Sequence, residues 1–185
     1  IINDEDEIAD MIKIMAQMFR MALSDTTPCY RIKNDIEYAE KFIALQNIRL
    51  PDMFYMEVRL DDKIEEASVI PLIIQPLVEN SIEHGYRGGN IPLHMILSGK
   101  IVEGNDISIT LQDDGKGMEM EQIAQIESLL SATVKAKLKL DQNESGNSIG
   151  MRNILERIQL YYGERYYVRI VRRDETGALV EVRIP

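Results

Sequence analysis

Apolar residues recur at helical spacing through the first quarter of the chain. Between Asp4 and Ser24 they return at steps of three and four residues, which predicts a helix with one apolar stripe. The stripe consists of Ile8, Met11, Ile12, Met15, Met18, Phe19 and Ala22. A second helix is predicted from Ile32 to Arg49 and is ended by Pro51. Because the stripe requires a packing partner, we expect residues 1–50 to form a helical arm on a globular domain of residues 51–185.

After residue 51 the pattern changes to short segments of both kinds. Alternating or β-branched stretches predict strands at 54–60, 91–101, 106–112, 166–172 and 178–184, the last two as a closing hairpin. Helical spacing predicts helices at 71–83, with Pro71 in the first turn, at 118–131 and at 150–162. Residues 132–147 are polar with little periodicity and are a candidate mobile lid. The second part is therefore expected to be a mixed domain of strands and helices.

Composition narrows the class of protein. With 185 residues, of which 45% are hydrophobic, the chain can bury the core of one ordinary domain. The net charge of −10 argues against nucleic acid or an anionic membrane surface as the main partner. Cys29 is the only cysteine, which excludes an internal disulfide framework and fits a reducing compartment. The longest apolar run, 69–78, is too short to span a membrane. No initiator Met or secretion signal opens the chain, so we expect a cut fragment.

Three separated motifs carry the candidate chemistry, and the first lies on the helix predicted at 71–83. Asn80 and His84 are one turn apart and share a polar face with Glu79. An amide oxygen suits Mg²⁺, which is otherwise held by water and substrate phosphates, and His84 is placed to donate to such phosphates. Taken alone, the motif also fits an amphipathic helix whose polar stripe is simply solvated.

The second motif is Asp113-Asp114-Gly115-Lys116-Gly117. Strand alternation continues the buried face of 107–111 to Asp113 and not to Asp114. A buried carboxylate needs a hydrogen-bond donor, which an adenine amino group provides, and Gly115 and Gly117 would let the backbone approach the ring. The alternative is a glycine-rich turn with a capping aspartate.

The third motif is Gly146-Asn147-Ser148-Ile149-Gly150, directly before a predicted helix. Backbone amides at a helix start, preceded by a flexible glycine, favour an anion. The spacing alone is a weak signal, and the chain contains no P-loop of the common ATPase type.

Together these residues resemble the ATP-binding domain of GHKL proteins, the group that includes gyrase and the histidine kinases. Within that group the stretches 70–85, 149–154 and 157–163 resemble sensor histidine kinases of the YesM/LytS type. The helix ending Ala44-Leu45-Gln46-Asn47-Ile48-Arg49 extends the likeness to nearly the whole chain. The fold implied is α+β, a two-layer α/β sandwich of the Bergerat type with an N-terminal helical arm.

The resemblance also implies roles for individual residues. Asn80 would bind Mg²⁺, Asp113 would hold the adenine amine, and Glu79, near the phosphates, would orient water or metal. Arg152, at the start of the last helix, would reach a phosphate or simply pack at the surface. Further residues implied to bind ATP are His84, Gly115, Gly117, Met118, Gly146, Ser148, Ile149 and Gly150.

Two positions depart from the family pattern. Glu83 is acidic where many histidine kinases carry Lys or Arg, which leaves His84, Arg87 or a lid lysine, Lys135 or Lys137, to neutralise the phosphates. Ser148 replaces a frequent glycine, although a small residue should still fit.

The acceptor histidine of the family is missing from this chain. The only histidines are His84 and His94, neither in a His-Phe-x-x-Asn motif, and His94 is expected to be structural. The resemblance therefore implies transfer of the ATP γ-phosphoryl group to a histidine on an upstream helix, in a homodimeric, membrane-anchored bacterial sensor whose cytoplasmic domain signals to a response regulator receiver domain. The alternatives are a nucleotide-sensing or scaffold module without transfer, and a GHKL ATPase or serine kinase of the anti-sigma type.

Overall fold

The computed structural model describes residues 4–24, 30–117, 123–124, 149–174 and 177–185. Five strands form one sheet in the order β1-β2-β3-β5-β4. The strands are β1 (Phe54–Arg59), β2 (Leu93–Ile101), β3 (Ile107–Asp113), β4 (Tyr167–Asp174) and β5 (Gly177–Ile184). β1 and β2 are parallel and the other neighbours are antiparallel, so the sheet is mixed. The expected strands and the closing hairpin of β4 and β5 are thus present, with ends shifted by one or two residues.

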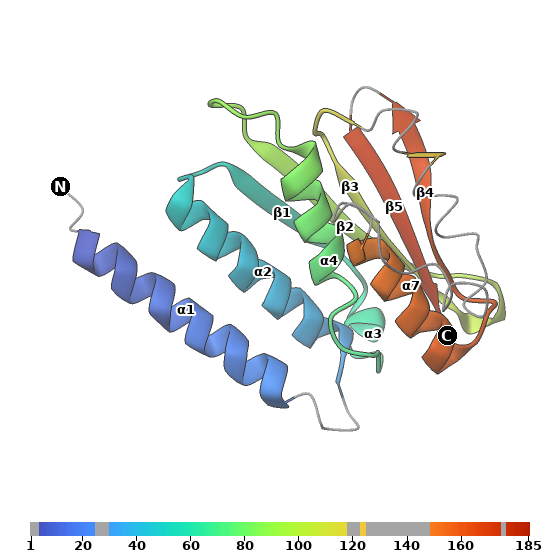
Figure 1. Ribbon diagram of the computed structural model, residues 1–185. Coiled ribbons are helices and arrows are strands. Elements are labelled where there is room, and N and C mark those ends of the chain that lie inside the picture. Colours follow the sequence, from blue (N-terminus) through green and yellow to red (C-terminus); the bar gives the residue numbers. More distant parts are fainter. Residues whose placement is uncertain (1–3, 25–29, 118–122, 125–148, 175–176) are drawn as a thin grey trace.

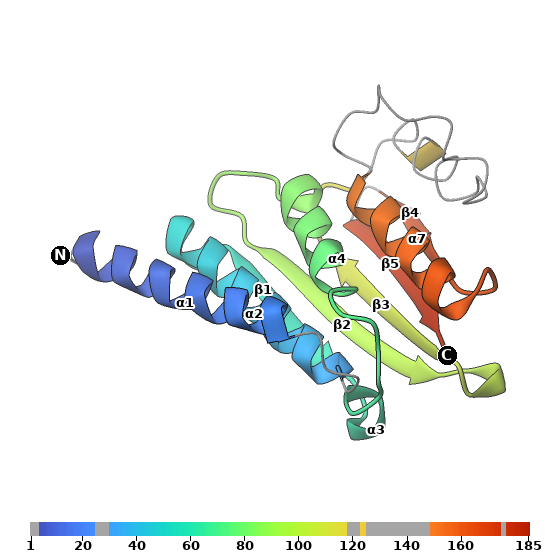
Figure 2. The ribbon, with the colours of Figure 1, turned by 60° about the horizontal axis from the view of Figure 1, so that its bottom comes forward.

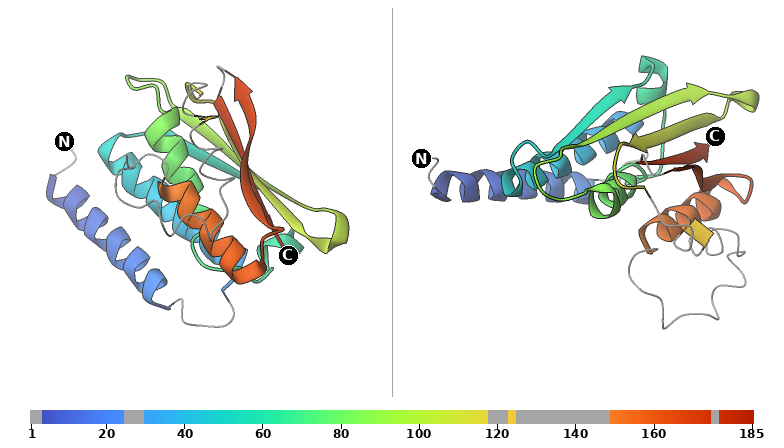
Figure 3. Two further views of the ribbon diagram at one scale, coloured as in Figure 1. Left: turned by 45° about the vertical axis from the view of Figure 1, so that its right-hand side comes forward. Right: turned by 90° about the horizontal axis from the view of Figure 1, so that it is seen from above.

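Helices cover one face of this sheet (Figures 1 and 2). The described helices are α1 (Asp4–Ser24), α2 (Ile32–Arg49), α3 (Asp62–Glu65), α4 (Gln75–Asn80) and α7 (Ile149–Tyr162), with a π-helix, η1 (Ser81–Gly85), directly after α4 and a 3-10 turn, η2 (Glu103–Asn105), between β2 and β3. Figure 3 shows the two layers edge-on, with the helices on one side of the strands. This is the α+β, two-layer architecture that was expected.

The core lies between the two layers and includes α2. Ile32, Ala39 and Ile43 of α2 are buried in the same cluster as the inner faces of the strands and of α4 and α7. α1 instead packs on α2, and Met18 is its one buried apolar side chain among those described. The division of the chain at residues 50 and 51 therefore stays a prediction, while α2 itself packs as part of the sheet domain.

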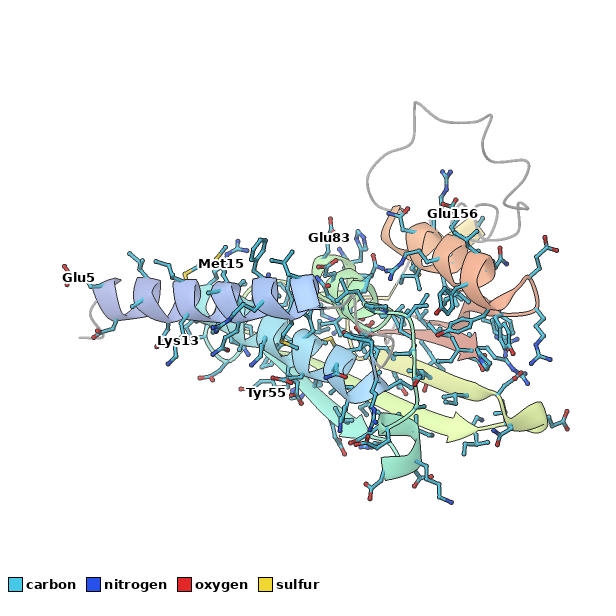
Figure 4. All side chains as sticks on the ribbon, turned by 90° about the horizontal axis from the view of Figure 1, so that it is seen from below. Glu5, Lys13, Met15, Tyr55, Glu83 and Glu156 are labelled. Carbon is cyan, nitrogen blue, oxygen red and sulfur yellow. The ribbon has the colours of Figure 1, made fainter. Side chains whose placement is uncertain are left out.

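The predicted stripe of α1 is only partly covered. Met18 is buried and Met11 is partly buried. Five apolar side chains are 54–64% exposed, namely Ile8, Ile12, Met15, Phe19 and Leu23. Met15 is labelled in Figure 4, which also shows Glu83 and Glu156 projecting from the helical layer. We call these five exposed residues the α1 stripe, a set that differs from the predicted stripe in including Leu23 and leaving out Met11, Met18 and Ala22. None of the described helices is long and apolar enough to cross a membrane.

The helix predicted at 71–83 begins later than expected, at Gln75, with Pro76 rather than Pro71 in its first turn. Leu72 has a left-handed backbone (φ 58°), which is incompatible with a helix starting at Pro71. The segment also runs on to Gly85, and its last five residues are π-helical. The short helix α3 was not predicted. The lid expected at 132–147 and most of the helix expected at 118–131 lie outside the described residues.

Candidate functional site

The carboxylate of Asp113 lies at the end of β3 and is 4% exposed. Its Oδ2 accepts a hydrogen bond from Ser81 Oγ at 2.9 Å. Its Oδ1 accepts from the backbone N–H of Gly115 at 2.9 Å and of Ala178 at 3.2 Å. Asp114 is exposed, and its Oδ1 accepts from the backbone N–H of His94 at 2.8 Å. The strand alternation therefore distinguished the two aspartates as predicted.

Asn80 ends α4 and His84 lies within η1, and both side chains line one narrow cavity with Asp113. Asn80 Nδ2 and His84 Nε2 are buried polar atoms without a hydrogen-bond partner. Buried polar groups normally have partners, so two orphaned nitrogens in one cavity point to a ligand that supplies acceptors. The structure thus brings together the residues predicted on the helix and on the strand.

The other walls of this cavity are small or apolar: Leu77, Ser81, Gly85, Gly117, Ala178 and Val180. Its free volume is about 10 Å³, the space of a single water. A purine ring therefore enters only if the walls separate. The partners of Asp113 from Ser81 and Ala178 were missed by sequence reasoning. A serine on the buried side of the predicted helix was the available signal for Ser81, whereas Ala178 contributes only its backbone.

The glycines near Asp113 are explained by backbone contacts. A Cβ atom on Gly115 would lie 2.5 Å from the Gly85 backbone, and one on Gly177 would lie 2.0 Å from the carbonyl oxygen of Asp113. Gly117 adopts φ 75°, a conformation that other residues rarely take. A Cβ on Gly150, by contrast, would be in ordinary contact with Asn80, 3.6 Å from Nδ2. Gly115 is thus required because the backbone of Gly85 packs against it. The sequence had suggested another reason, the approach of an adenine ring.

Glu79 is a half-buried carboxylate one residue before Asn80. Burial raises its pKa, the hydrogen bond from Gln75 opposes this, and the charge of Glu83 raises it further. Glu79 also borders a wider groove between α4 and α7, with a volume of about 600 Å³. Gly150, Asn153 and Arg157 line the α7 side of that groove.

The two arginines considered for phosphate binding, Arg87 and Arg152, both have partners. Arg87 donates to the carbonyl oxygens of Asp114 at 3.3 Å and Gly115 at 2.9 Å, so it holds the glycine turn. Arg152 Nε pairs with Glu156 Oε1 at 2.9 Å on α7. His94 stacks on Tyr55, with ring centroids 5.1 Å apart, on the face of the sheet away from the helices.

Several predicted site residues lie outside the described residues, namely Met118, Gly146, Ser148, Lys135 and Lys137. Ile149 is the first residue of α7, but its side chain is not described. Within the described part of the chain, no cluster of three His, Cys, Asp or Glu side chains could hold a metal ion.

Comparison with known proteins gives two matching family models. The model described as histidine kinase-, DNA gyrase B-, and HSP90-like ATPase matches residues 66–185, and the model described as histidine kinase matches residues 1–54. Among curated relatives, the sensor histidine kinase YesM of Bacillus subtilis is 24% identical over 99% of this chain. The sensor protein LytS of Oceanobacillus iheyensis is 29% identical over 96% of it. The chain spans 28% of the length of each.

A solved structure shares the fold. The histidine kinase domain of a blue-light activated histidine kinase from Erythrobacter litoralis superposes with a TM-score of 0.56 at 12% identity. The likeness covers 97% of this chain and 74% of that domain. The shared architecture therefore includes the helices before β1 as well as the sheet.

Proposed function

Because the chain belongs to the family of histidine kinase-, DNA gyrase B- and HSP90-like ATPases, we propose that it is the ATP-binding catalytic domain of a sensor histidine kinase. Its reaction is transfer of the ATP γ-phosphoryl group to a histidine outside this chain. The observation that carries the proposal is the meeting of buried Asp113 with the unpartnered nitrogens of Asn80 and His84 in one cavity.

The residues of this cavity fit Mg·ATP. Asp113 Oδ2 has one donor, Ser81 Oγ, and retains a lone pair for the adenine amino group. The amide of Asn80 can offer its oxygen to Mg²⁺ and its unpaired nitrogen to a phosphate oxygen or a metal-bound water. Mg²⁺, when bound, supplies positive charge that stabilises the transferring phosphoryl group.

The phosphates need a donor in this acidic chain. His84 is the best placed among the described residues, since its Nε2 has no hydrogen-bond partner, with the Glu83 carboxylate 4.0 Å away, and its side chain lines the cavity. Arg87 would first have to release the carbonyls of Asp114 and Gly115. Met118, Gly146, Ser148, Ile149 and Gly150 remain proposed contacts from the glycine motifs, and Glu79 is proposed to orient water or metal beside them.

The acceptor helix and the regulator are proposed partners. The α1 stripe offers an exposed apolar surface of the kind that an upstream helix of a homodimeric kinase would cover. We propose a response regulator receiver domain as the next acceptor and anchoring of the parent protein in a membrane through segments outside this chain. The net charge of −10 is unfavourable for a nucleic-acid partner.

Nucleotide binding is tested by calorimetry with Mg·ATP on the 185-residue chain. Asp113→Asn should weaken binding about tenfold to a hundredfold, because a charged acceptor is replaced by an amide that presents a donor. Asp114→Asn is the matched control and should bind as wild type, because Asp114 is exposed and pairs with backbone. Equal affinity of Asp113→Asn and wild type would refute the assignment.

Phosphotransfer is tested by adding the acceptor helix in trans. The expected product is an acid-labile, base-stable phosphate on that helix, formed with Mg·ATP by wild type and not by Asn80→Ala. ATP binding without such a product would favour the nucleotide-sensing or scaffold module instead.

A further inference from the structure

Asp35 of α2 is a fully buried carboxylate that the proposed chemistry does not use. Its Oδ1 accepts hydrogen bonds from the backbone N–H of Leu72 at 2.7 Å and from Tyr30 Oη at 3.0 Å. Its Oδ2 accepts from the backbone N–H of Ile73 and of Ile74, each at 2.8 Å. Burial raises the pKa of Asp35, while the four donated bonds act in the opposite direction.

These bonds hold the turn that leads into α4, and they come from a distant element. Ile74 is the N-cap of α4 and makes no side-chain capping bond of its own. The N–H groups at a helix start have no partner within the helix and carry its positive dipole end, so a carboxylate is the acceptor that suits them best. Asp35 therefore fixes the N-cap residue of α4 and the two residues before it, whereas a local Ser or Asp would accept from N–H groups inside the first turn.

The opposite side of the same turn is held by α7. Leu72 is left-handed (φ 58°), a costly conformation for a branched residue that persists only when its surroundings enforce it. Arg157 of α7 donates to the carbonyl oxygens of both Pro71 and Leu72, the latter at 3.2 Å. The turn before α4 is thus fixed through its N–H groups by α2 and through its carbonyl groups by α7.

α4 is short enough to carry a change at its start to the site. It has six residues and ends at Asn80, so at 1.5 Å per residue its two ends lie about 9 Å apart. The backbone of Asp113, in contrast, belongs to β3, and its carboxylate also accepts from Gly115 and Ala178, which lie outside α4. We infer that Asp35 is a positioning residue that sets Asn80, and with it the Mg²⁺-dependent part of nucleotide binding, and that it couples α2 to the site. This inference rests on the proposed function.

The test compares ATP affinity with Mg²⁺ and with a chelator, by calorimetry on the full 185-residue chain. Asp35→Asn is nearly isosteric but turns an NH₂ group toward two N–H donors. Its gain in affinity from Mg²⁺ should fall about tenfold, because charged hydrogen bonds to the turn before α4 are lost, while Mg²⁺-free affinity stays within about twofold. Amide hydrogen exchange is a second measurement that needs neither ATP nor Mg²⁺. In Asp35→Asn, exchange at the backbone N–H groups of Leu72, Ile73 and Ile74 should be faster than in wild type.

Matched controls separate positioning from stability. Ile43→Ala, on the same helix, removes buried apolar surface but none of the Asp35 bonds. It should lower the unfolding temperature while leaving the effect of Mg²⁺ on ATP affinity intact. If Asp35→Asn does not fold, Arg157→Ala tests the same turn, because Arg157 is exposed and its removal should be tolerated. This variant should reduce the effect of Mg²⁺ on ATP affinity about threefold. Arg59→Ala, an exposed arginine paired with Glu57, should leave it unchanged.

Each outcome bears on one proposal. Wild type without Mg·ATP binding refutes the proposed function. A second outcome is that Mg²⁺ raises the ATP affinity of wild type, Asp35→Asn and Arg157→Ala equally. That result overturns the inference but does not affect the proposed function. An equal loss in Ile43→Ala and Asp35→Asn also overturns it, because the effect would then follow from stability alone.

Discussion

At the scale of single residues, two glycines of the site should differ in their tolerance for a side chain. Gly115→Ala should lower the free energy of unfolding by about 1–3 kcal/mol, because its Cβ would lie 2.5 Å from the Gly85 backbone. Gly150→Ala should be neutral or stabilising by about 0.5–1 kcal/mol, because Gly150 lies in the first turn of α7 with ordinary contacts. Denaturant unfolding of both variants measures this, and similar losses in the two would contradict the packing argument.

Glu79 should make stability depend on pH. Its pKa in the folded protein is raised above the ordinary 4.5, chiefly by burial, so folding favours the protonated form. That contribution is present below the ordinary pKa and is lost as pH rises through the folded value. Glu79→Gln lacks this penalty, so its unfolding temperature should rise relative to that of wild type as the pH increases above the ordinary pKa of 4.5.

Glu83→Gln is the control for this titration. The charge of Glu83 raises the pKa of Glu79 less than burial does. Most of the dependence of stability on pH should therefore persist in Glu83→Gln. Thermal unfolding across the pH range gives both comparisons. Parallel curves for Glu79→Gln and wild type would show that Glu79 is not penalised by folding.

At the scale of elements, α1 and α2 should contribute very differently to stability. Removing residues 1–29 should leave a folded domain whose Mg·ATP affinity stays within about twofold, because α1 buries little against the rest and lies away from the cavity. Ile36→Ala in α2 should cost about 2–4 kcal/mol, because Ile36 belongs to the core. Circular dichroism melts and calorimetry test both, and loss of folding on removal of α1 would contradict the first.

The limits of both α1 and α2 could be predicted from the sequence because helical periodicity is a local signal. The start of α4 could not. The turn before it is held by Asp35, 39 positions before Ile74, and nothing in the residues around Pro71 indicates that this turn stays non-helical. Asp113 was predictable because strand alternation reaches the end of β3, whereas its partner Ala178 comes from another strand through a backbone N–H. Local patterns thus predicted that Asn80, His84 and Asp113 would lie together in one cavity, whereas only the fold supplied the partners of Asp113.

At the scale of the whole molecule, the negative net charge opposes self-association of the chain, whereas the α1 stripe favours it. A net charge of −10 keeps copies apart, yet the stripe repeats apolar residues at steps of four, three, four and four, as in helices that pair. We therefore expect weak self-association of the 185-residue chain through α1, strengthened by salt as charge repulsion is screened.

Phe19→Glu tests this surface. It should weaken self-association about tenfold or more, because pairing would bury an unpartnered carboxylate on a residue that is 64% exposed in the single chain. Leu160→Glu, on α7 and 85% exposed, is the matched control and should associate as wild type. Sedimentation equilibrium at two salt concentrations measures both variants. Association that is lost in Leu160→Glu but kept in Phe19→Glu would place the contact on α7 and leave the α1 stripe for the upstream helix alone.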